Sequence, residues 1–131
     1  MKRMAGLALM CCVLSAQATQ DESTPCDTVE NDQQAYACAA FNQQTAEREL
    51  KTAFDELLQR ITEQYPQVQA ETLASRLNAA NRLWYQVRKA DCEAETGGLQ
   101  PDTQAYQAAW DNCVAQHSDD RSEYLQSILQ P

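Results

Sequence analysis

Four cysteines that follow an export leader constrain the fold of this chain more than any other feature. The chain starts with a cationic Lys2-Arg3, continues with an apolar run over residues 4–14, and reaches a small-residue exit at Ser15-Ala16-Gln17-Ala18. This is the pattern of a secretory signal peptide, and the run is shorter than the roughly 20 residues of a membrane-spanning helix. We therefore expect a signal peptide over residues 1–18 and a periplasmic or secreted product.

Cleavage after Ala18 would remove two cysteines and leave an even number, which are Cys26, Cys38, Cys92 and Cys113. An even number of cysteines in an oxidising compartment predicts two disulfides. Zinc is the alternative, but the spacing contains no C-x-x-C pair. We therefore expect neither a metal site nor a cofactor.

The charge of the chain is strongly acidic. The leader contains two of the ten basic residues and none of the 19 acidic ones, so cleavage would leave eight against 19, a formal charge of −11. Such a charge disfavours nucleic acid and anionic membranes and attracts a cationic protein at long range. The alternative is that acidity only keeps the protein soluble. The oligomeric state stays open.

Abundant Ala, Gln, Glu and Leu, with only three glycines in the chain, predict an all-α domain. We expect a loose segment over residues 19–27 and a helical domain over residues 28–131. Short connections make successive helices antiparallel neighbours, so the predicted fold is an up-down-up three-helix bundle stapled by two disulfides. The expected helices cover about 28–65, about 68–95, and the chain from Pro101 onward.

Local signals predict where these helices begin and end. Thr28 is the expected N-cap of the first helix, and Pro66 is expected to end it. Gly97-Gly98 is expected to adopt the left-handed geometry that stops the second helix. Pro101 suits the first turn of the third, where Asp102 would complement the helix dipole.

Apolar residues at spacings of three and four predict the packing faces. The first face is Leu50, Phe54, Leu57 and Ile61, and the second is Leu73, Leu77, Ala80, Trp84 and Val87. The third helix has a stripe that includes Tyr106, Trp110, Cys113 and His117. On this stripe His117 is expected to be an interfacial residue rather than a metal ligand or a base.

Depth along the bundle ranks the possible disulfide pairings. At 1.5 Å per residue, Cys38 lies about 15 Å below the expected start of its helix and Cys113 about 18 Å below the start of its own. Cys26 and Cys92 both lie near that same end of the bundle. This favours Cys26–Cys92 with Cys38–Cys113, which would tie all three helices together. The local pairing, Cys26–Cys38 with Cys92–Cys113, would need a break in the first helix before Cys38.

The sequence contains no recognisable catalytic motif. It has no G-x-S-x-G, H-E-x-x-H, P-loop or glycine-rich dinucleotide turn. Bridged cysteines leave no thiolate nucleophile, and one histidine without an evident partner does not make a triad. We therefore expect a binding protein with no catalytic residues rather than an enzyme.

One longer pattern carries more information than composition. It begins with Cys38 and the run from Glu47 to Phe54, continues through residues 77–92 to a Gly-Gly pair, and ends with Cys113, Arg121 and Leu125. This resembles the small secreted bacterial family of LprI-type lysozyme inhibitors, over residues 26–125. The chain departs from the family pattern at Glu47, Lys51, Phe54 and Asn81. The motif residues that we assign mainly to structure are Glu47, Leu50, Trp84, Arg88, Gly97, Gly98 and Arg121.

The resemblance implies an exported inhibitor of lysozyme or a related envelope-defence protein. Trp84, Arg88 and Cys92 share one side of a helix, and we expect Arg88 either to pair with a carboxylate or to cap helix-end carbonyls. The candidate surface for a cationic partner is the acidic group around the Gly-Gly loop, which consists of Asp91, Glu93, Glu95 and Asp102. The alternative function is a periplasmic scaffold or interaction module with a partner other than lysozyme.

Overall fold

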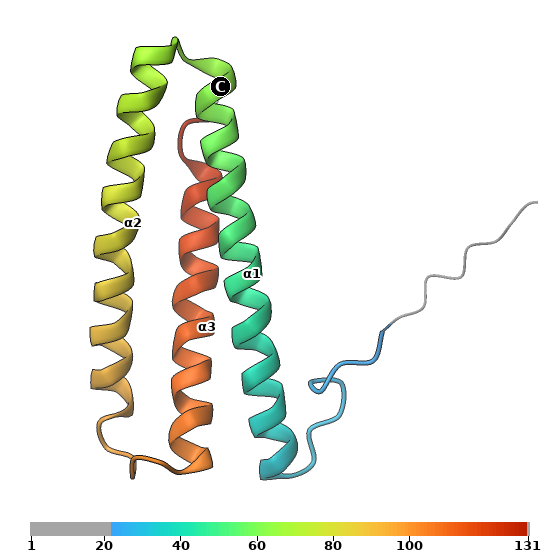
Figure 1. Ribbon diagram of the computed structural model, residues 1–131. Coiled ribbons are helices and arrows are strands. Elements are labelled where there is room, and N and C mark those ends of the chain that lie inside the picture. The colour runs from blue at the N-terminus through green and yellow to red at the C-terminus, as the bar shows by residue number, and fades with distance from the viewer. Residues whose placement is uncertain (1–21, 131) are drawn as a thin grey trace, which may run out of the picture.

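Three antiparallel helices make up the fold. The computed structural model describes residues 22–130, and within them it contains no strand. Figure 1 shows the up-down-up order, which confirms the predicted all-α bundle. The expected signal peptide and its cleavage site lie outside the described residues. The helices are α1 (Asp32–Gln64), α2 (Gln67–Thr96) and α3 (Gln104–Ser127).

Side-chain caps fix the starts of two helices. The Asn31 side chain accepts a hydrogen bond from the Gln34 amide at 3.0 Å, and Thr103 Oγ1 accepts one from the Tyr106 amide at 3.1 Å. Both occupy the N-cap position. The expected cap at Thr28 is therefore wrong, because Asn31, one of the strongest N-cap residue types, starts α1 closer to the core.

The two connections differ in how they turn the chain. Pro66 follows an extended Tyr65 between α1 and α2, as expected for a residue before proline. Gly97, in contrast, has a right-handed φ of −62°, so the expected left-handed glycine cap is wrong. In the connection between α2 and α3 it is Asp102 that is left-handed, with a φ of 62°, a conformation that Asp tolerates. Asp102 therefore precedes the cap of α3 and does not lie in its first turn.

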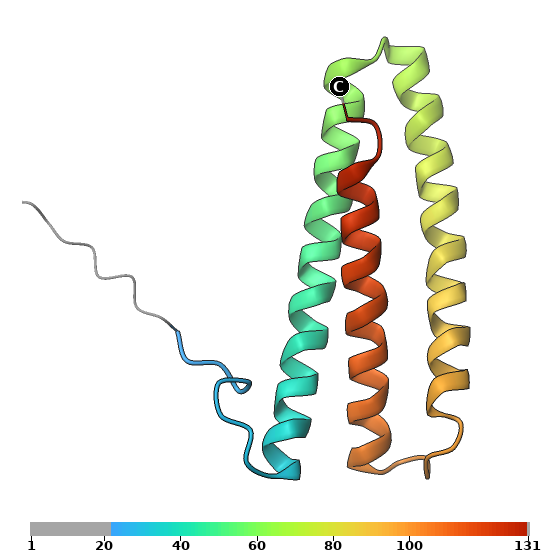
Figure 2. The same cartoon turned by 180° about the vertical axis from the view of Figure 1, so that it is seen from behind.

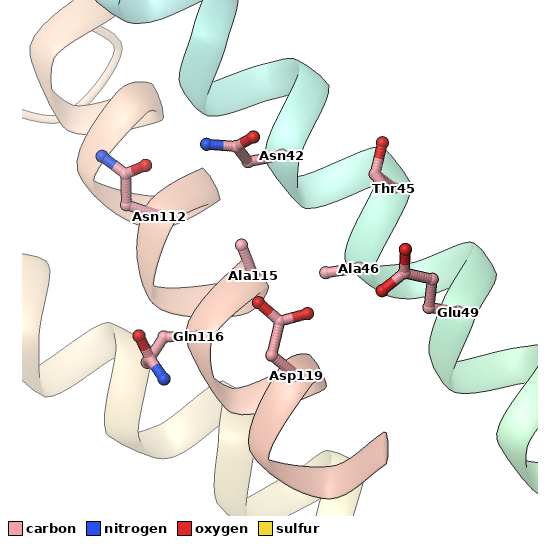
Figure 3. Close-up of a pocket in the computed structure, with 8 residues that line it drawn as sticks. All are labelled: Asn42, Thr45, Ala46, Glu49, Asn112, Ala115, Gln116 and Asp119. Atoms are coloured by element: carbon pink, nitrogen blue, oxygen red, sulfur yellow. The ribbon is translucent and has the colours of Figure 1, made fainter. Parts of the chain in front are cut away.

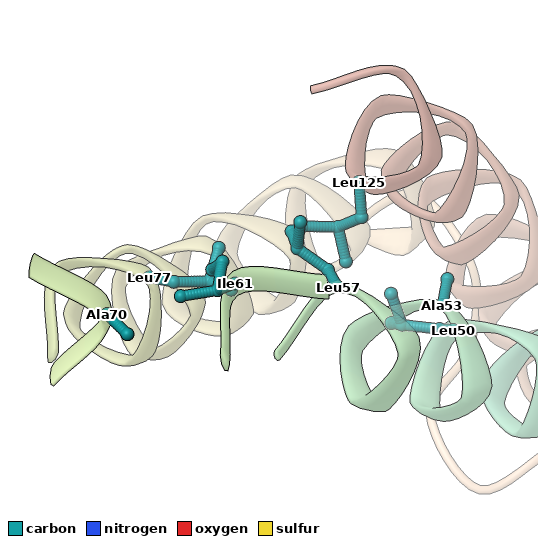
Figure 4. Packing of buried hydrophobic residues seen from close by; sticks show 7 residues of the cluster. All are labelled: Leu50, Ala53, Leu57, Ile61, Ala70, Leu77 and Leu125. Carbon is teal, nitrogen blue, oxygen red and sulfur yellow. The ribbon is translucent and has the colours of Figure 1, made fainter. Parts of the chain in front are cut away.

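The main core is built along α1. Helices α1 and α3 pack most closely, whereas α2 contacts both through fewer residues, and both ribbon views show α1 and α3 side by side (Figures 1 and 2). Figure 4 shows that side chains from all three helices meet in this core. Its buried members are Leu50, Ala53, Leu57, Ile61, Ala70, Leu77 and Leu125.

The inward face of α2 matches the predicted face only in part. Leu77 is buried, and Leu73 and Trp84 are partly buried against the core, as the pattern indicated. Ala80 is exposed and Val87 is 55% exposed, so their predicted place in the packing face is wrong. The half-buried positions along this part of α2 belong instead to the polar residues Asn81 and Arg88.

Both disulfides are local. The structure joins Cys26 to Cys38 and Cys92 to Cys113. The favoured pairing, Cys26–Cys92 with Cys38–Cys113, is therefore wrong. The first bridge ties the segment before α1 to α1, and the second ties α2 to α3. Neither one joins α1 to another helix.

The first helix starts later than expected, which changes the depth of Cys38 in the bundle. Since α1 begins at Asp32, Cys38 lies only about 9 Å along it. The preceding segment comes back against the helix, so the Cα atoms of Cys26 and Cys38 are 4.8 Å apart. Hydrogen bonds from Thr24 to the Asp27 carboxylate, at 2.7 and 2.8 Å, form a turn in this segment and hold the pKa of Asp27 below its usual value. No break in α1 is needed.

Among the described residues, no helix carries an apolar stretch long enough to cross a bilayer.

Candidate functional site

An arginine from α2 joins the three helices near the middle of the bundle. Arg88 Nη1 lies 3.1 Å from Glu47 Oε1 on α1 and donates a hydrogen bond to Ser118 Oγ on α3 at 2.9 Å. The second Glu47 oxygen accepts a hydrogen bond from Gln43 Nε2 at 2.5 Å. The Arg88 side chain is only 14% exposed, whereas Glu47 is 39% exposed. Of the two expected roles of Arg88, the structure therefore shows the pairing with a carboxylate.

Aromatic rings flank this arginine. The guanidinium of Arg88 lies 5.2 Å from the ring centre of Trp84 and 4.9 Å from that of Tyr85. Arg121 lies over the same Trp84 ring at 5.6 Å and over Tyr124 at 5.1 Å, distances at which cation–π attraction acts. Burial lowers the pKa of Arg121, and the two nearby tyrosines oppose that shift.

The family-motif residues thus gather in two places. Glu47, Trp84, Arg88 and Arg121 form one network across the bundle, and Leu50 is 1% exposed in the core. Gly97 and Gly98 lie apart, exposed at the end of α2. A Cβ at Gly97 would meet the Glu93 carbonyl oxygen at 3.2 Å, whereas one at Gly98 would meet no atom within 4 Å.

The four acidic residues expected to bind a partner do not share one face. His117 Nε2 on α3 lies 3.7 Å from Glu95 Oε1 and 4.0 Å from Asp91 Oδ2. Glu93 projects from another side of α2, since residues two apart point roughly 200° apart on a helix, and it pairs with Lys89. Asp102 lies in the turn before α3. The structure therefore brings together Asp91 and Glu95 but not all four.

A metal site at this end is not supported by the donor chemistry. Ligand atoms of Cys92, Cys113 and His117 lie within 4.8 Å of one another. The two sulfur atoms are bonded to each other, and a disulfide offers no thiolate to a metal. This group is instead a histidine packed beside a buried disulfide.

A polar groove lies between α1 and α3 (Figure 3). It encloses about 420 Å³, with Asn42, Thr45, Ala46 and Glu49 on the α1 side and Asn112, Ala115, Gln116 and Asp119 on the α3 side. The alanines Ala46 and Ala115 are buried, and such small side chains let polar groups form the rim. The groove therefore offers hydrogen-bonding amides and carboxylates around a narrow floor.

Two carboxylates from different helices line this groove. Burial raises the pKa of Asp119, and the nearby charges of Glu49 and Asp120 raise it further. Glu49 also lines a neighbouring hollow of about 420 Å³ that includes Glu56 and Ser122. The depression therefore continues along the α1–α3 interface, and a cation placed in it would relieve the repulsion between carboxylates.

Sequence reasoning missed the groove. Glu49 and Asp119 lie far apart in the chain, and each looks like an ordinary solvated acid of an amphipathic helix. The available signal was the small residues Ala46 and Ala115, which let two helices approach closely. Without the relative rotation of α1 and α3, that signal does not place the two carboxylates together.

These features define a small, disulfide-stabilised three-helix protein with an acidic groove between its first and third helices. Residues 26–125 match the family described as lysozyme inhibitor LprI. The match covers most of the chain, and the protein belongs to this family.

A solved structure agrees with the assignment. The chain is similar to a DUF1311 family protein from Pseudomonas putida KT2440, known from its crystal structure, at 53% sequence identity and a TM-score of 0.69. The alignment covers 77% of this chain and 96% of that one. No curated protein gave a significant match.

Proposed function

We propose that this protein acts outside the cytoplasm and binds a cationic protein, with lysozyme as the target and inhibition as the outcome. The observation that carries the proposal is the carboxylate-lined groove of Glu49 and Asp119 in a member of the lysozyme inhibitor LprI family. Two disulfides support an extracytoplasmic location. An inhibitor of this kind needs no catalytic residue, because a preorganised surface that blocks a cleft is sufficient.

The charges are distributed unevenly over the molecule, which favours the approach of a basic partner from one side. Residues 72–90 of α2 contain Arg76, Arg82, Arg88 and Lys89 and no acidic residue. The acids concentrate on α1, on α3 and at the two ends of α2. A basic partner is therefore attracted to the α1–α3 side and repelled by the middle of α2.

The groove has a specific use for a cation. The pKa of Asp119 is raised by partial desolvation and by the nearby negative charge of Glu49, so this exposed carboxyl ionises less readily than a free aspartate. A lysine or arginine side chain that enters between the two carboxylates would favour the ionised form and gain charge-assisted hydrogen bonds. The side-chain amides of Asn42, Asn112 and Gln116 line the same groove and would offer further hydrogen bonds to the bound partner.

A second acidic surface is the group at the end of α2 that the sequence indicated. Asp91 and Glu95 lie beside His117, and Glu93 and Asp102 lie nearby in the chain. These acids are exposed and face solvent on more than one side. They would add to long-range attraction, whereas the groove offers a defined contact.

A lysis assay with matched variants tests the proposal. The purified, oxidised protein is mixed with lysozymes of several types, and cell-wall lysis is followed across a salt series. We expect inhibition that weakens as salt rises, because screening shortens the reach of the charges. Absence of inhibition with every lysozyme at micromolar excess would reject the lysozyme target and leave the scaffold or interaction module.

Two double variants locate the contact. Glu49→Gln with Asp119→Asn neutralises the groove, and Asp91→Asn with Glu95→Gln neutralises the end of α2 by the same amount. We expect the first variant to lose inhibition and the second to retain most of it. The reverse result would move the contact to the end of α2, and equal small losses would mean that charge acts only in the encounter.

A further inference from the structure

An apolar stripe on α2 faces solvent. Leu83 is 63% exposed and Val87 is 55% exposed. The members of the stripe are the exposed Ala80, Leu83, Val87, Ala90 and Ala94. They follow one another at alternating spacings of three and four residues, which is typical of a helix that packs on another helix. The inward face of α2 runs instead through Leu77 and Cys92, so within the described chain the stripe has no partner.

The stripe is symmetric about residue 85. Leu83 and Val87 lie two residues on either side of it, and Ala80 and Ala90 lie five residues on either side. A two-fold interface requires this self-complementarity, because residue i of one copy contacts residue j of the other and the reverse holds. Two antiparallel α2 helices centred on residue 85 would pack Leu83 against the partner's Val87, with small alanines outside them.

Charge selects the same orientation. Arg76 extends the stripe at one end, nine residues before residue 85, and it has no ion-pair partner among residues 22–130. Nine residues after residue 85 stands Ala94, beside Glu93 and Glu95. An antiparallel pair therefore places Arg76 beside Glu93 of the other copy, since Glu95 lies on the side of α2 that faces His117, whereas a parallel pair would place Arg76 against Arg76.

We propose that a second copy of this chain covers the stripe, as an antiparallel homodimer formed through α2. Its centre is Leu83 against Val87, and its ends are held by Arg76 against Glu93. The seam over residues 80–94 is about 21 Å long. A single helix pair of that length buries less than a standard interface of roughly 800 Å² per partner, so the dimer dissociates on dilution. The acidic α1–α3 groove stays free in it.

Sedimentation across a concentration series tests the assembly. The oxidised protein is measured from low micromolar to millimolar concentration, and we expect the average mass to rise from one chain toward two. Leu83→Glu should keep it at one chain, and its far-UV spectrum should be unchanged because this side chain is exposed. A monomer at every concentration, or a dimer that survives Leu83→Glu, would overturn the proposal.

A charge swap tests the orientation. Arg76→Glu alone and Glu93→Arg alone each place like charges across the seam, and we expect each to weaken the dimer about tenfold or more. The double variant restores the opposite charges, and we expect its dissociation constant to return toward the wild-type value. Lys51→Glu, an exposed change of the same charge on α1, is the matched control. Single and double variants with equal affinity would overturn the antiparallel arrangement.

Discussion

Arg88 on α2 connects the three helices through an ion pair to α1 and a hydrogen bond to α3. It reaches Glu47 on α1 and Ser118 on α3 from a position on α2 that is 14% exposed. Its two partners differ, because Glu47 keeps access to water and Ser118 is fully buried. Ser118 Oγ also donates to the Val114 carbonyl at 2.6 Å. Loss of the Glu47 carboxylate would leave the buried guanidinium of Arg88 without a counter-charge. Loss of Arg88 would leave Glu47 in contact with water and Ser118 bonded to the Val114 carbonyl.

We predict that removing Glu47 costs more stability than removing Arg88. Glu47→Ala leaves a largely buried guanidinium without its carboxylate, and we expect a loss of about 1–2 kcal/mol, discounted from a fully buried pair because Glu47 is partly solvated. Arg88→Met keeps much of the apolar stem and frees Glu47 to turn to water, so its loss should be about 1 kcal/mol or less. Chemical denaturation measures both. A larger loss for Arg88→Met would contradict this order. The control is Glu56→Ala, which removes an exposed carboxylate from α1.

Asp119 should destabilise the fold at neutral pH. Its pKa is raised in the folded protein, so the unfolded chain loses the proton first and gains stability relative to the folded state as pH rises. The penalty is absent below the unfolded value of about 3.9 and complete above the folded value. Asp119→Asn should therefore raise the free energy of unfolding at pH 7 by about 0.5 kcal/mol or less, because the carboxylate is largely solvated. The gain should vanish in acid.

Denaturation of wild type and Asp119→Asn at several pH values measures this difference. Glu123→Gln, an exposed change on the same helix, controls for net charge. A gain that persists below the unfolded aspartate value would contradict the assignment of the penalty to ionisation.

Among the elements, α2 is the least firmly held. It contributes Ala70 and Leu77 to the core at one end and Cys92 and Thr96 at the other. Between them its half-buried positions include Asn81, Trp84 and Arg88, and of these three only Trp84 is apolar. The middle of α2 therefore depends on the arginine network and on packing at its two ends.

We predict that the middle of α2 opens before the rest of the bundle. Amide hydrogen exchange should be faster over residues 78–90 than over residues 50–61 of α1, because local opening follows buried apolar contact. The measurement is native-state exchange followed by mass spectrometry, at a concentration where the protein is monomeric. Uniform protection along α2 and α1 would contradict the prediction.

The elements were largely predictable from sequence, and their rotations were not. Helix formers, Pro66 and the glycine pair were enough to predict three antiparallel helices. In α2, however, the pattern of Leu77 and Trp84 and that of Ala80 and Val87 both fit helical spacing, and only packing against α1 and α3 decides which one is buried. The groove of Glu49 and Asp119 depends on the same rotation, so it appears only in three dimensions.

The disulfide pairing failed for a related reason. It depended on helix starts, and a shift from Thr28 to Asp32 changes the depth of Cys38 by about 6 Å. A cap such as Asn31 is visible in the sequence, but Thr28 is also a favoured residue type at that position, only somewhat weaker. Propensity alone does not choose between them.

At the scale of the whole molecule, non-covalent packing holds α1 to α3, whereas disulfides hold the elements that pack less extensively. The α1–α3 interface has the most extensive packing and no disulfide across it. The Cys92–Cys113 bridge holds the less well packed α2 to α3 and is buried beside Val114 and Trp110. The Cys26–Cys38 bridge only holds the N-terminal segment to α1.

We therefore predict that the two bridges differ in their effect on stability. Cys92→Ser with Cys113→Ser should lower the free energy of unfolding by about 3 kcal/mol, since the bridge closes a loop across two helices. Cys26→Ser with Cys38→Ser should cost clearly less, because its segment can detach while the α1–α3 core of Leu50, Leu57 and Leu125 stays packed. Thermal and denaturant unfolding measure both variants, and far-UV spectra should remain helical at 25 °C because neither bridge crosses the α1–α3 interface. A larger loss from the N-terminal bridge would show that residues 22–31 are part of the cooperative core and not an appendage clamped to it.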